Sequence, residues 1–316
     1  MRNGNEPKTL QEAIVYFDDP DNCLNYLVSR RWPSGVVCPT CGSSDVSFVA
    51  SRRVWQCKTR HVKCQFSVKV GTIFEDSAVS LDKWLCAMWM IANCKNGISS
   101  WEIHRAIKVT QKTAWFMLHR IRLSMQSGSL MKMGGSGGAV EVDETYIGGK
   151  ARNMHRDRRE RMIDGRGTAG KVAVLGLLQR HGKGKHKVRL ATVQPIIRKN
   201  VKAGSEVYTD SHSGYDGLSD EYFHEFVNHA ETYARGKVHT NGLENFWSLL
   251  KRGLRGTYVS VEPFHLFRYL DEQAFRYNNR KEMNDADRFN EIVKRVTGKR
   301  VTYDKLTGKE GETTAF

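Results

Sequence analysis

Two aspartates that interrupt strand-like stretches constrain this chain more than any other feature. Residues 139–149 combine β-branched residues with a Gly-Gly stop, which predicts a strand with Asp143 near its middle. Residues 206–211 form another short strand pattern, with Asp210 close to its end. A carboxylate inside a strand is costly unless it is paired or binds a metal ion. The alternative for Asp143 is exposure on an edge strand or a turn-capping position.

The residues between the two aspartates predict how the strands meet. Residues 171–178 and 187–193 both have strand patterns, joined through a turn at 181–185, and residues 195–201 fit a short crossover helix. A right-handed crossover then places the first and fourth strands side by side in one sheet. The sequence therefore predicts an α/β fold in which both carboxylates reach one site.

A third candidate acid lies at the start of a predicted helix. Residues 239–252 carry apolar side chains at helical spacing, and Asn241 and Glu244 share one face of that helix. Taken alone, Glu244 fits a solvated helix acid or a capping box with Thr240 or Asn241. Beside two strand-borne acids it favours a metal site, because three carboxylates repel one another unless a cation lies between them. Hard oxygen ligands of this kind suit Mg²⁺ or Mn²⁺.

These acids resemble a known catalytic arrangement. Asp143, Asp210 and Glu244, on strand, strand and helix, look like the DDE motif of RNase H-like transposases and integrases. Within that class the chain most resembles the bacterial insertion-sequence transposases of the ISXO2-like group, from about Cys38 to about Arg280. The residues that carry the resemblance are Val142-Asp143-Glu144-Thr145-Tyr146-Ile147-Gly148-Gly149, Thr209-Asp210, His239-Thr240-Asn241, Glu244, Phe246-Trp247-Ser248-Leu249-Leu250-Lys251-Arg252-Gly253, Gly256-Thr257-Tyr258 and residues 269–278.

The resemblance implies both fold and activity. The implied fold is an RNase H-like mixed sheet flanked by helices, preceded by a small zinc ribbon and a helix-turn-helix module. The implied activity is that of a DNA transposase, with two Mg²⁺ or Mn²⁺ ions bridged by Asp143. Some members of the group carry Asn at the third position, so Glu244 and Asn241 both remain candidates, and the stronger affinity of a carboxylate for Mg²⁺ favours Glu244. The alternatives are a nuclease of the same fold without strand transfer, or a DNA-binding regulator.

Cysteine spacing predicts a zinc ribbon. Cys38 and Cys41 form a knuckle followed by a glycine, and Cys57 ends a strand-like stretch. The fourth ligand is either His61, at an acceptable spacing, or Cys64, at a longer one, and the resemblance favours His61. The alternative is a set of ordinary thiols in a reducing compartment. A site with four protein ligands would hold a structural Zn²⁺ ion.

Residues 80–125 predict a DNA-binding module. A short helix at 99–107, a tight turn and a longer helix are typical of a helix-turn-helix, and a plain three-helix bundle is the alternative. The predicted recognition helix begins with Gln111, Lys112 and Thr113, and Arg120 lies further along it.

Charge supports a nucleic-acid partner. Lys and Arg total 50 against 34 Asp and Glu, which gives a net charge of +16. We expect double-stranded DNA, both element ends and target, as the partner, with Lys251, Arg252 and the basic segment 150–171 near its phosphates. A solvated charge run is the alternative for that segment. No signal sequence or membrane span is indicated, so we expect a cytoplasmic, nucleoid-associated protein, dimeric or larger on DNA.

The expected domains follow the chain in order. They are an N-terminal helical module at 1–35, the zinc ribbon at 36–75, the helix-turn-helix at 76–130, the catalytic domain at 131–285 and a loose C-terminal tail at 286–316.

Overall fold

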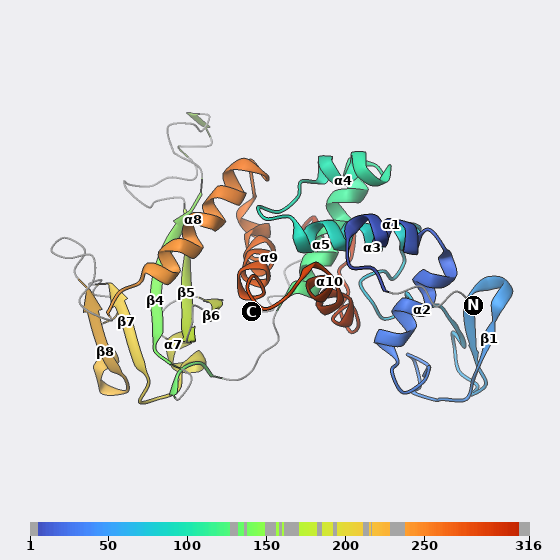
Figure 1. The fold of residues 1–316 in the computed structure, drawn as a ribbon, viewed down its shortest axis with the longest axis horizontal. Coiled ribbons are helices and arrows are strands. Elements are labelled where there is room, and N and C mark those ends of the chain that lie inside the picture. The colour runs from blue at the N-terminus through green and yellow to red at the C-terminus, as the bar shows by residue number, and fades with distance from the viewer. Residues whose placement is uncertain are drawn as a thin grey trace. The chain divides into compact units, whose positions relative to one another are not determined.

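The computed structural model divides the chain into two compact units. Unit 1 comprises Met1–Gln126 and Glu282–Phe316, and unit 2 comprises Ser127–Lys281 (Figure 1). Each unit is described by itself. The structure describes residues 6–126, 132–135, 138–148, 156–157, 160, 171–181, 185–191, 195–210, 215, 217–227 and 238–309.

Unit 1 begins with two helices, α1 (Leu10–Phe17) and α2 (Pro20–Arg31). The two helices are separate, because the Asp19 side chain accepts a hydrogen bond from the Asp21 N–H and Pro20 begins α2. The ribbon follows as an antiparallel sheet of β1 (Val46–Val49), β2 (Val54–Cys57) and β3 (Gln65–Phe66), with a 3-10 turn, η1 (Ala50–Arg52), between the first two strands. The core of this sheet is aromatic, since Trp55 meets Trp32 and Phe66 at ring-centroid distances of 5.6 and 5.9 Å.

The remaining helices of unit 1 come from both ends of the chain. They are α3 (Leu81–Asn93), α4 (Ser100–Ile107), α5 (Gln111–Met125), α10 (Asp285–Lys294) and α11 (Tyr303–Leu306). The short turn between α4 and α5 and the capping box of Ser99 and Glu102 agree with the predicted helix-turn-helix pattern.

The C-terminal segment differs from the loose tail expected from residue 286. Asn284 and Asp287 form a capping box that begins α10, and Phe289 and Ile292 are fully buried. The ring of Phe289 lies 4.9 Å from that of Trp89 on α3. The charged residues of α10 hide this pattern in the sequence, because the helix gains its stability from packing rather than from local propensity.

Unit 2 is built on a five-stranded sheet in the order β6-β5-β4-β7-β8. The strands are β4 (Val140–Ile147), β5 (Val172–His181), β6 (Lys185–Ala191), β7 (Glu206–Asp210) and β8 (Phe223–Val227). The pairs β4–β5 and β5–β6 are antiparallel, whereas β4–β7 and β7–β8 are parallel. This is the mixed α/β sheet of the predicted fold class, and the fold class is confirmed.

Helices cover the two faces of this sheet. The helices and 3-10 turns of unit 2 whose bounds lie within the described residues are α7 (Pro195–Asn200), η6 (Leu218–Asp220), α8 (Asn241–Gly256), η7 (Pro263–His265) and α9 (Leu266–Asn278). Val140 and Val142 of β4 face a core that includes Ile197 of α7. On the other face, Leu243 and Trp247 of α8 pack on β5, and Figure 1 shows α8 crossing β4 and β5. Alternate residues of β4 therefore face different layers.

None of the described helices is long and apolar enough to cross a membrane.

Candidate functional site

Two predicted acids meet on neighbouring parallel strands of unit 2. β4 and β7 pair with Val140 opposite Val207 and Glu141 opposite Tyr208, so the same offset places Asp143 beside Asp210. Carboxylate oxygens of Asp143, Glu144 and Asp210 all lie within 4.8 Å of one another. The predicted crossover thus brings both strand-borne aspartates to one place, and Glu144 joins them.

The indole of Trp247 fixes one side of Asp143. Its Nε1–H donates to Asp143 Oδ2 at 2.9 Å. Gly176 lies opposite Asp143 on β5, and a Cβ atom there would lie 2.6 Å from the Trp247 ring. A glycine at this point therefore allows the indole to lie against the sheet and reach the carboxylate.

The environment of Asp143 disfavours its charged form. Burial raises the pKa of Asp143 to about 7, and the charges of Asp210 and Glu144 act in the same direction, whereas the Trp247 hydrogen bond opposes them. The cluster therefore accumulates negative charge that a cation would relieve. Oxygen ligands crowded in this way fit Mg²⁺ or Mn²⁺.

Glu144 was not among the site residues predicted from the sequence. The Tyr215 hydroxyl donates to Glu144 Oε2, and the Tyr215 side chain is buried. Burial and the neighbouring Glu144 charge raise the pKa of Tyr215, so this hydroxyl stays protonated and remains a donor. A signal was present in the sequence, because Glu144 directly follows Asp143 in a stretch otherwise rich in apolar residues.

The α8 candidates lie at the start of that helix. Asn241 and Glu244 are exposed in its first turn, and the Thr240 hydroxyl donates to Glu244 Oε1 at 3.5 Å. Among the described acids, the 4.8 Å group does not include Glu244. Glu244 nevertheless lies three residues before Trp247, which contacts Asp143, so the two side chains are neighbours on the helix surface. The structure leaves Glu244 and Asn241 as the two candidates for a third ligand.

A buried ion pair, also missed from the sequence, anchors the start of α8. Glu141 lies two residues before Asp143 on β4, and its side chain is 1% exposed. Its carboxylate accepts hydrogen bonds from Arg180 Nε at 2.6 Å and from the Leu243 N–H at 3.0 Å. Arg180 also donates to the carbonyl of His239 at 2.5 Å. Burial and the adjacent Arg180 charge lower the pKa of His239, so this residue, two positions before α8, is neutral near pH 7.

The predicted zinc ligands come together in unit 1. Ligand atoms of Cys38, Cys41, Cys57 and His61 all lie within 4.8 Å of one another. Cys38 Sγ lies 3.4 Å from His61 Nε2, and Cys41 Sγ lies 3.6 Å from Cys57 Sγ. Cys64, the alternative ligand, is not in this group. Its backbone carbonyl instead accepts a hydrogen bond from Cys57 N.

The chemistry of these four groups fits a structural zinc ion. His61 Nδ1 lies 2.8 Å from the Val62 carbonyl, which can only accept, so Nδ1 carries the proton and Nε2 is left to bind a metal. Burial raises the pKa of Cys38, but N–H groups of Cys41 and Thr40 outweigh it and lower the pKa to about 6. A thiolate is the form that binds zinc.

The predicted DNA-contacting residues of unit 1 divide into two groups. Gln111, Lys112 and Thr113 form the first turn of α5, where the Thr110 side chain accepts from the Thr113 N–H at 3.1 Å. Arg120 requires a correction, because it is 4% exposed and its Nε donates to the Val301 carbonyl. The C-terminal segment covers this part of α5, so Arg120 is not a surface group available to DNA.

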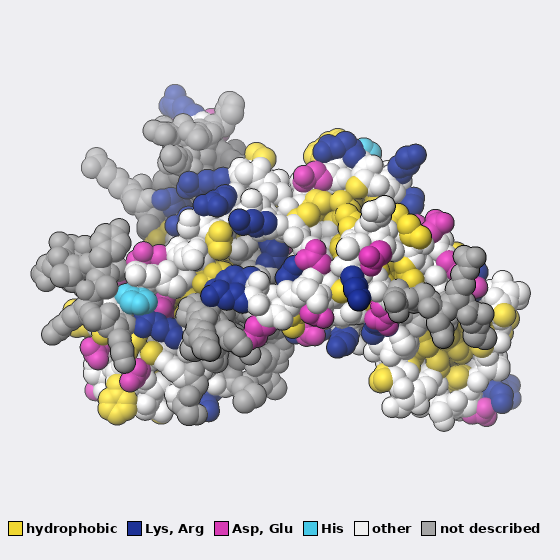
Figure 2. Space-filling model, in the orientation of Figure 1, with side chains coloured by type: hydrophobic (Ala, Val, Ile, Leu, Met, Phe, Trp, Pro, Cys, Tyr) yellow, Lys and Arg dark blue, Asp and Glu magenta, His cyan; other side chains and the backbone are white. Residues whose placement is uncertain are grey.

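The predicted basic residues of unit 2 lie on α8 or in a region that the structure describes only in part. Arg252 is exposed and Lys251 is half-buried, and Figure 2 shows Lys and Arg side chains gathered over the end of α8 near α9. Of the basic segment 150–171, only residues 156–157, 160 and 171 are among those described. The rest of that prediction lies outside the described residues.

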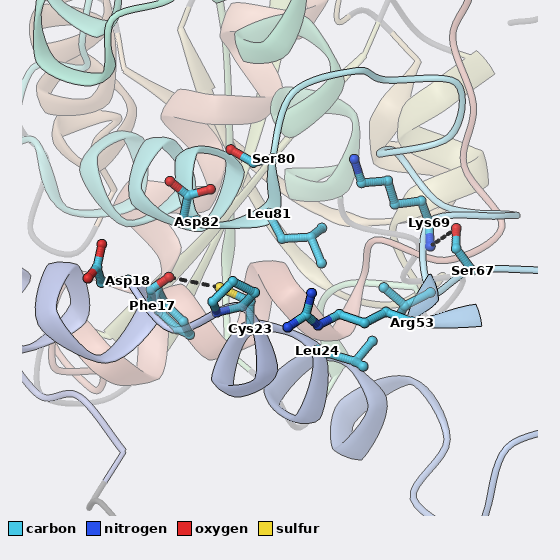
Figure 3. Close-up of a pocket in the computed structure, with 12 residues that line it drawn as sticks. Phe17, Asp18, Cys23, Leu24, Arg53, Ser67, Lys69, Ser80, Leu81 and Asp82 are labelled. Atoms are coloured by element: carbon cyan, nitrogen blue, oxygen red, sulfur yellow. Dashed lines mark hydrogen bonds between the residues drawn. The ribbon is translucent and has the colours of Figure 1, made fainter. Parts of the chain in front are cut away.

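A cavity of about 380 Å³ in unit 1 is separate from both clusters (Figure 3). It is lined by apolar side chains such as Phe17, Leu24 and Leu81 together with the charged Arg53 and Lys69. None of the predicted site residues lines it, so it has no part in the site.

Comparisons with known proteins agree with these features. A family model described as "ISXO2-like transposase domain" matches residues 136–278, and one described as "Transposase zinc-ribbon domain" matches residues 19–65. The chain is similar to an uncharacterized protein in transposable element ISH50 of Halobacterium salinarum, with 31% identity over 260 residues, which is 76% of this chain and 85% of that protein. It is also similar to an uncharacterized transposase-like protein of Haemophilus influenzae, with 36% identity over 108 residues, which is 34% of this chain and 87% of that protein.

Proposed function

This chain belongs to the ISXO2-like transposase family, and on that basis we propose that it binds insertion-sequence ends and catalyses Mg²⁺-dependent DNA cleavage and strand transfer. The observation that carries the proposal is the meeting of Asp143 and Asp210 on adjacent parallel strands, with Glu144 beside them. The substrate would be double-stranded DNA, which the net charge of +16 favours. Such a substrate would place the protein at the nucleoid in the cytoplasm.

The acids would act by holding divalent metal. Asp143 and Asp210, with Glu244 or Asn241 from α8, would hold two Mg²⁺ or Mn²⁺ ions. Bound there, such ions activate water or a DNA 3′-hydroxyl and stabilise the leaving oxygen. Trp247 donates to Asp143 Oδ2 and thereby fixes the orientation of a carboxylate that would hold metal.

The rest of the chain would bind and position DNA. The first turn of α5, with Gln111, Lys112 and Thr113, lies in the predicted helix-turn-helix, and Lys251 and Arg252 lie on the helix that carries the third candidate ligand. The Cys38-Cys41-Cys57-His61 group would hold a structural zinc ion that folds the ribbon and takes no part in the chemistry. Two element ends must be joined to one target, so we expect a dimer or larger assembly on DNA.

The test is cleavage and joining of labelled element-end duplex in the presence of Mg²⁺. We expect the wild-type protein to yield both cut and joined products, and Asp210→Ala to yield neither. If Glu244→Gln abolishes joining and Asn241→Ala only weakens it, Glu244 is the third ligand, and the reverse result assigns that role to Asn241. Cut products that never become joined would indicate a nuclease, and binding without cutting would indicate a DNA-binding regulator.

A further inference from the structure

We propose that the exposed face of α4, rather than the body of α5, is the surface of unit 1 that contacts duplex DNA. The surface consists of Trp101, Arg105 and Lys108 on or next to α4, continued by Lys112 at the start of α5. This inference rests on the proposed function, since it assigns a surface to the DNA that a transposase must hold. It also replaces the sequence-based expectation that α5 reads the DNA along its length.

The helix α5 is largely enclosed by other parts of unit 1. A recognition helix needs an open face to lie in the major groove, which is about 12 Å wide. Beyond its first turn α5 offers little open surface, because most of its side chains are buried. The buried residues are Ala114, Met117, Leu118, His119, Arg120, Ile121, Arg122, Ser124 and Met125.

The C-terminal segment covers the remaining face of α5. Lys112, Phe116 and Arg120 are spaced by four and share one face. Lys112 Nζ lies 4.5 Å from the centroid of the Tyr303 ring, and the Phe116 ring lies 5.8 Å from it. Arg120 donates to the Val301 carbonyl, as described above. Only the first turn of this face, at Lys112, is open to solvent.

The helix α4 has an exposed face with basic side chains, which the body of α5 lacks. Trp101, Arg105 and Lys108 follow at intervals of four and three residues, so they share one side of the helix. All three are exposed, and Trp101, at 59%, is the only tryptophan among the large hydrophobic side chains that the structure describes as exposed. Figure 2 shows Lys, Arg and His side chains beside an exposed hydrophobic group over α4.

The surface is continuous with the start of α5. Gln111 Nε2 donates to Ser100 Oγ at 2.9 Å, which joins the first turns of the two helices. Glu102, the one acid in residues 99–113, accepts from the Ser99 N–H at 2.7 Å in the capping box. Arg105, Lys108 and Lys112 therefore leave the surface with a positive charge of two after Glu102 is subtracted.

Duplex DNA is the partner that this chemistry fits. Exposed Lys and Arg side chains bind DNA phosphates. These contacts set the position of a protein on DNA and make its affinity depend on salt. A large aromatic ring beside them supplies apolar contact to the sugars, with few rotatable bonds to order. An eight-residue helix spans about 12 Å, so the surface fits a few successive phosphates.

The experiment measures binding of the full-length, zinc-loaded protein to labelled duplex from the ends of its own element, at several salt concentrations. The double variant Arg105→Ala/Lys108→Ala should weaken binding at least tenfold at moderate salt. It should also lower the slope of log K against log salt by about 2, since each lost phosphate contact removes about 0.9. The matched control Lys294→Ala removes an exposed cation from α10 and should change neither quantity.

A second readout isolates Trp101. DNA should protect a fraction of the tryptophan fluorescence from iodide quenching in the wild type, and Trp101→Phe should remove that fraction. Trp101→Phe should retain most of the affinity that Trp101→Ala loses, because a ring of similar size remains. All these positions are exposed, so unchanged circular dichroism is expected and checks folding.

The outcomes separate this inference from the proposed function. If the double variant binds with wild-type affinity and slope while the wild type cuts and joins DNA, the α4 surface is wrong and the transposase function stands. If instead Tyr303→Ala strengthens DNA binding and the α4 variants have no effect, α5 is the reading helix after the C-terminal segment moves away. If the wild type neither binds nor cuts element ends, both proposals are wrong.

Discussion

At the scale of single residues, Asp143 has the most constrained environment. It lies on a strand, and its carboxylate accepts a hydrogen bond from the Trp247 N–H. Carboxylate oxygens of Glu144 and Asp210 lie within 4.8 Å of it. A cluster of carboxylates at partly buried positions is unstable without protons or a cation. In the metal-free protein, burial and the neighbouring charges raise the pKa of Asp143 to about 7.

The raised pKa of Asp143 predicts how the stability of the metal-free protein depends on pH. Between the ordinary value of 3.8 and about 7, folded Asp143 keeps a proton that the unfolded chain has lost. The free energy of unfolding therefore falls as pH rises through that window. From pH 5 to pH 8 the loss due to Asp143 should reach at most about 3 kcal/mol, since one pKa unit corresponds to about 1.4 kcal/mol.

The measurement is urea unfolding at pH 5 and pH 8 in buffer free of Mg²⁺, with zinc kept bound. Asp143→Asn lacks the titrating group, so it should lose less stability across this range than the wild type, and adding Mg²⁺ at pH 8 should stabilise only the wild type. Equal pH dependence in the two proteins would contradict the raised pKa.

At the scale of elements, the start of α8 is fixed to the sheet by charge as well as by packing. The Glu141 carboxylate on β4 accepts hydrogen bonds from Arg180 of β5 and from the Leu243 N–H in the first turn of α8. Gly242 permits this approach, because a Cβ atom there would lie 2.7 Å from Glu141 Oε2. The three elements that surround Asp143 are thus joined at one buried carboxylate.

Removal of this carboxylate should be strongly destabilising. Glu141→Ala leaves the Arg180 charge and the Leu243 N–H without their acceptor, and breaking a buried pair in this way costs about 3–5 kcal/mol. Glu141→Gln should cost less, because its amide oxygen still accepts. The matched control is Glu221→Ala, which breaks the half-exposed pair of Glu221 with Arg198 and should cost less than about 1 kcal/mol.

Urea unfolding of the three variants checks this prediction. Equal midpoints for Glu141→Ala and Glu221→Ala would mean that the buried pair does not hold α8 in place.

At the scale of the whole molecule, the sequence was informative where local pattern and topology decide the structure. The strands with Asp143 and Asp210 were predictable because a parallel crossover leaves few ways to arrange them. The cysteine spacing likewise indicated the ribbon cluster. Residues such as Glu141 and Arg180 were not predictable, since they pair across 39 positions through a strand register that no local pattern specifies.

The C-terminal segment illustrates the same limit. Residues 285–294 are rich in charge, and their helix depends on Phe289 docking against Trp89, two hundred residues earlier. Arg120 was expected on the surface for the same reason, because the segment that buries it lies far away in sequence. Long-range packing, which sequence periodicity does not report, decided both cases.

The proposed function requires that Asp143 and Asp210 form one divalent-cation site. The most direct measurement is a Mn²⁺ titration of the full-length, zinc-loaded protein followed by electron paramagnetic resonance. We predict that the wild type binds Mn²⁺ and that Asp210→Asn and Asp143→Asn each weaken this binding at least tenfold. The control Asp220→Asn, which removes an acid of η6 outside the cluster, should leave the affinity unchanged. Wild-type Mn²⁺ affinity in both site variants would contradict this prediction.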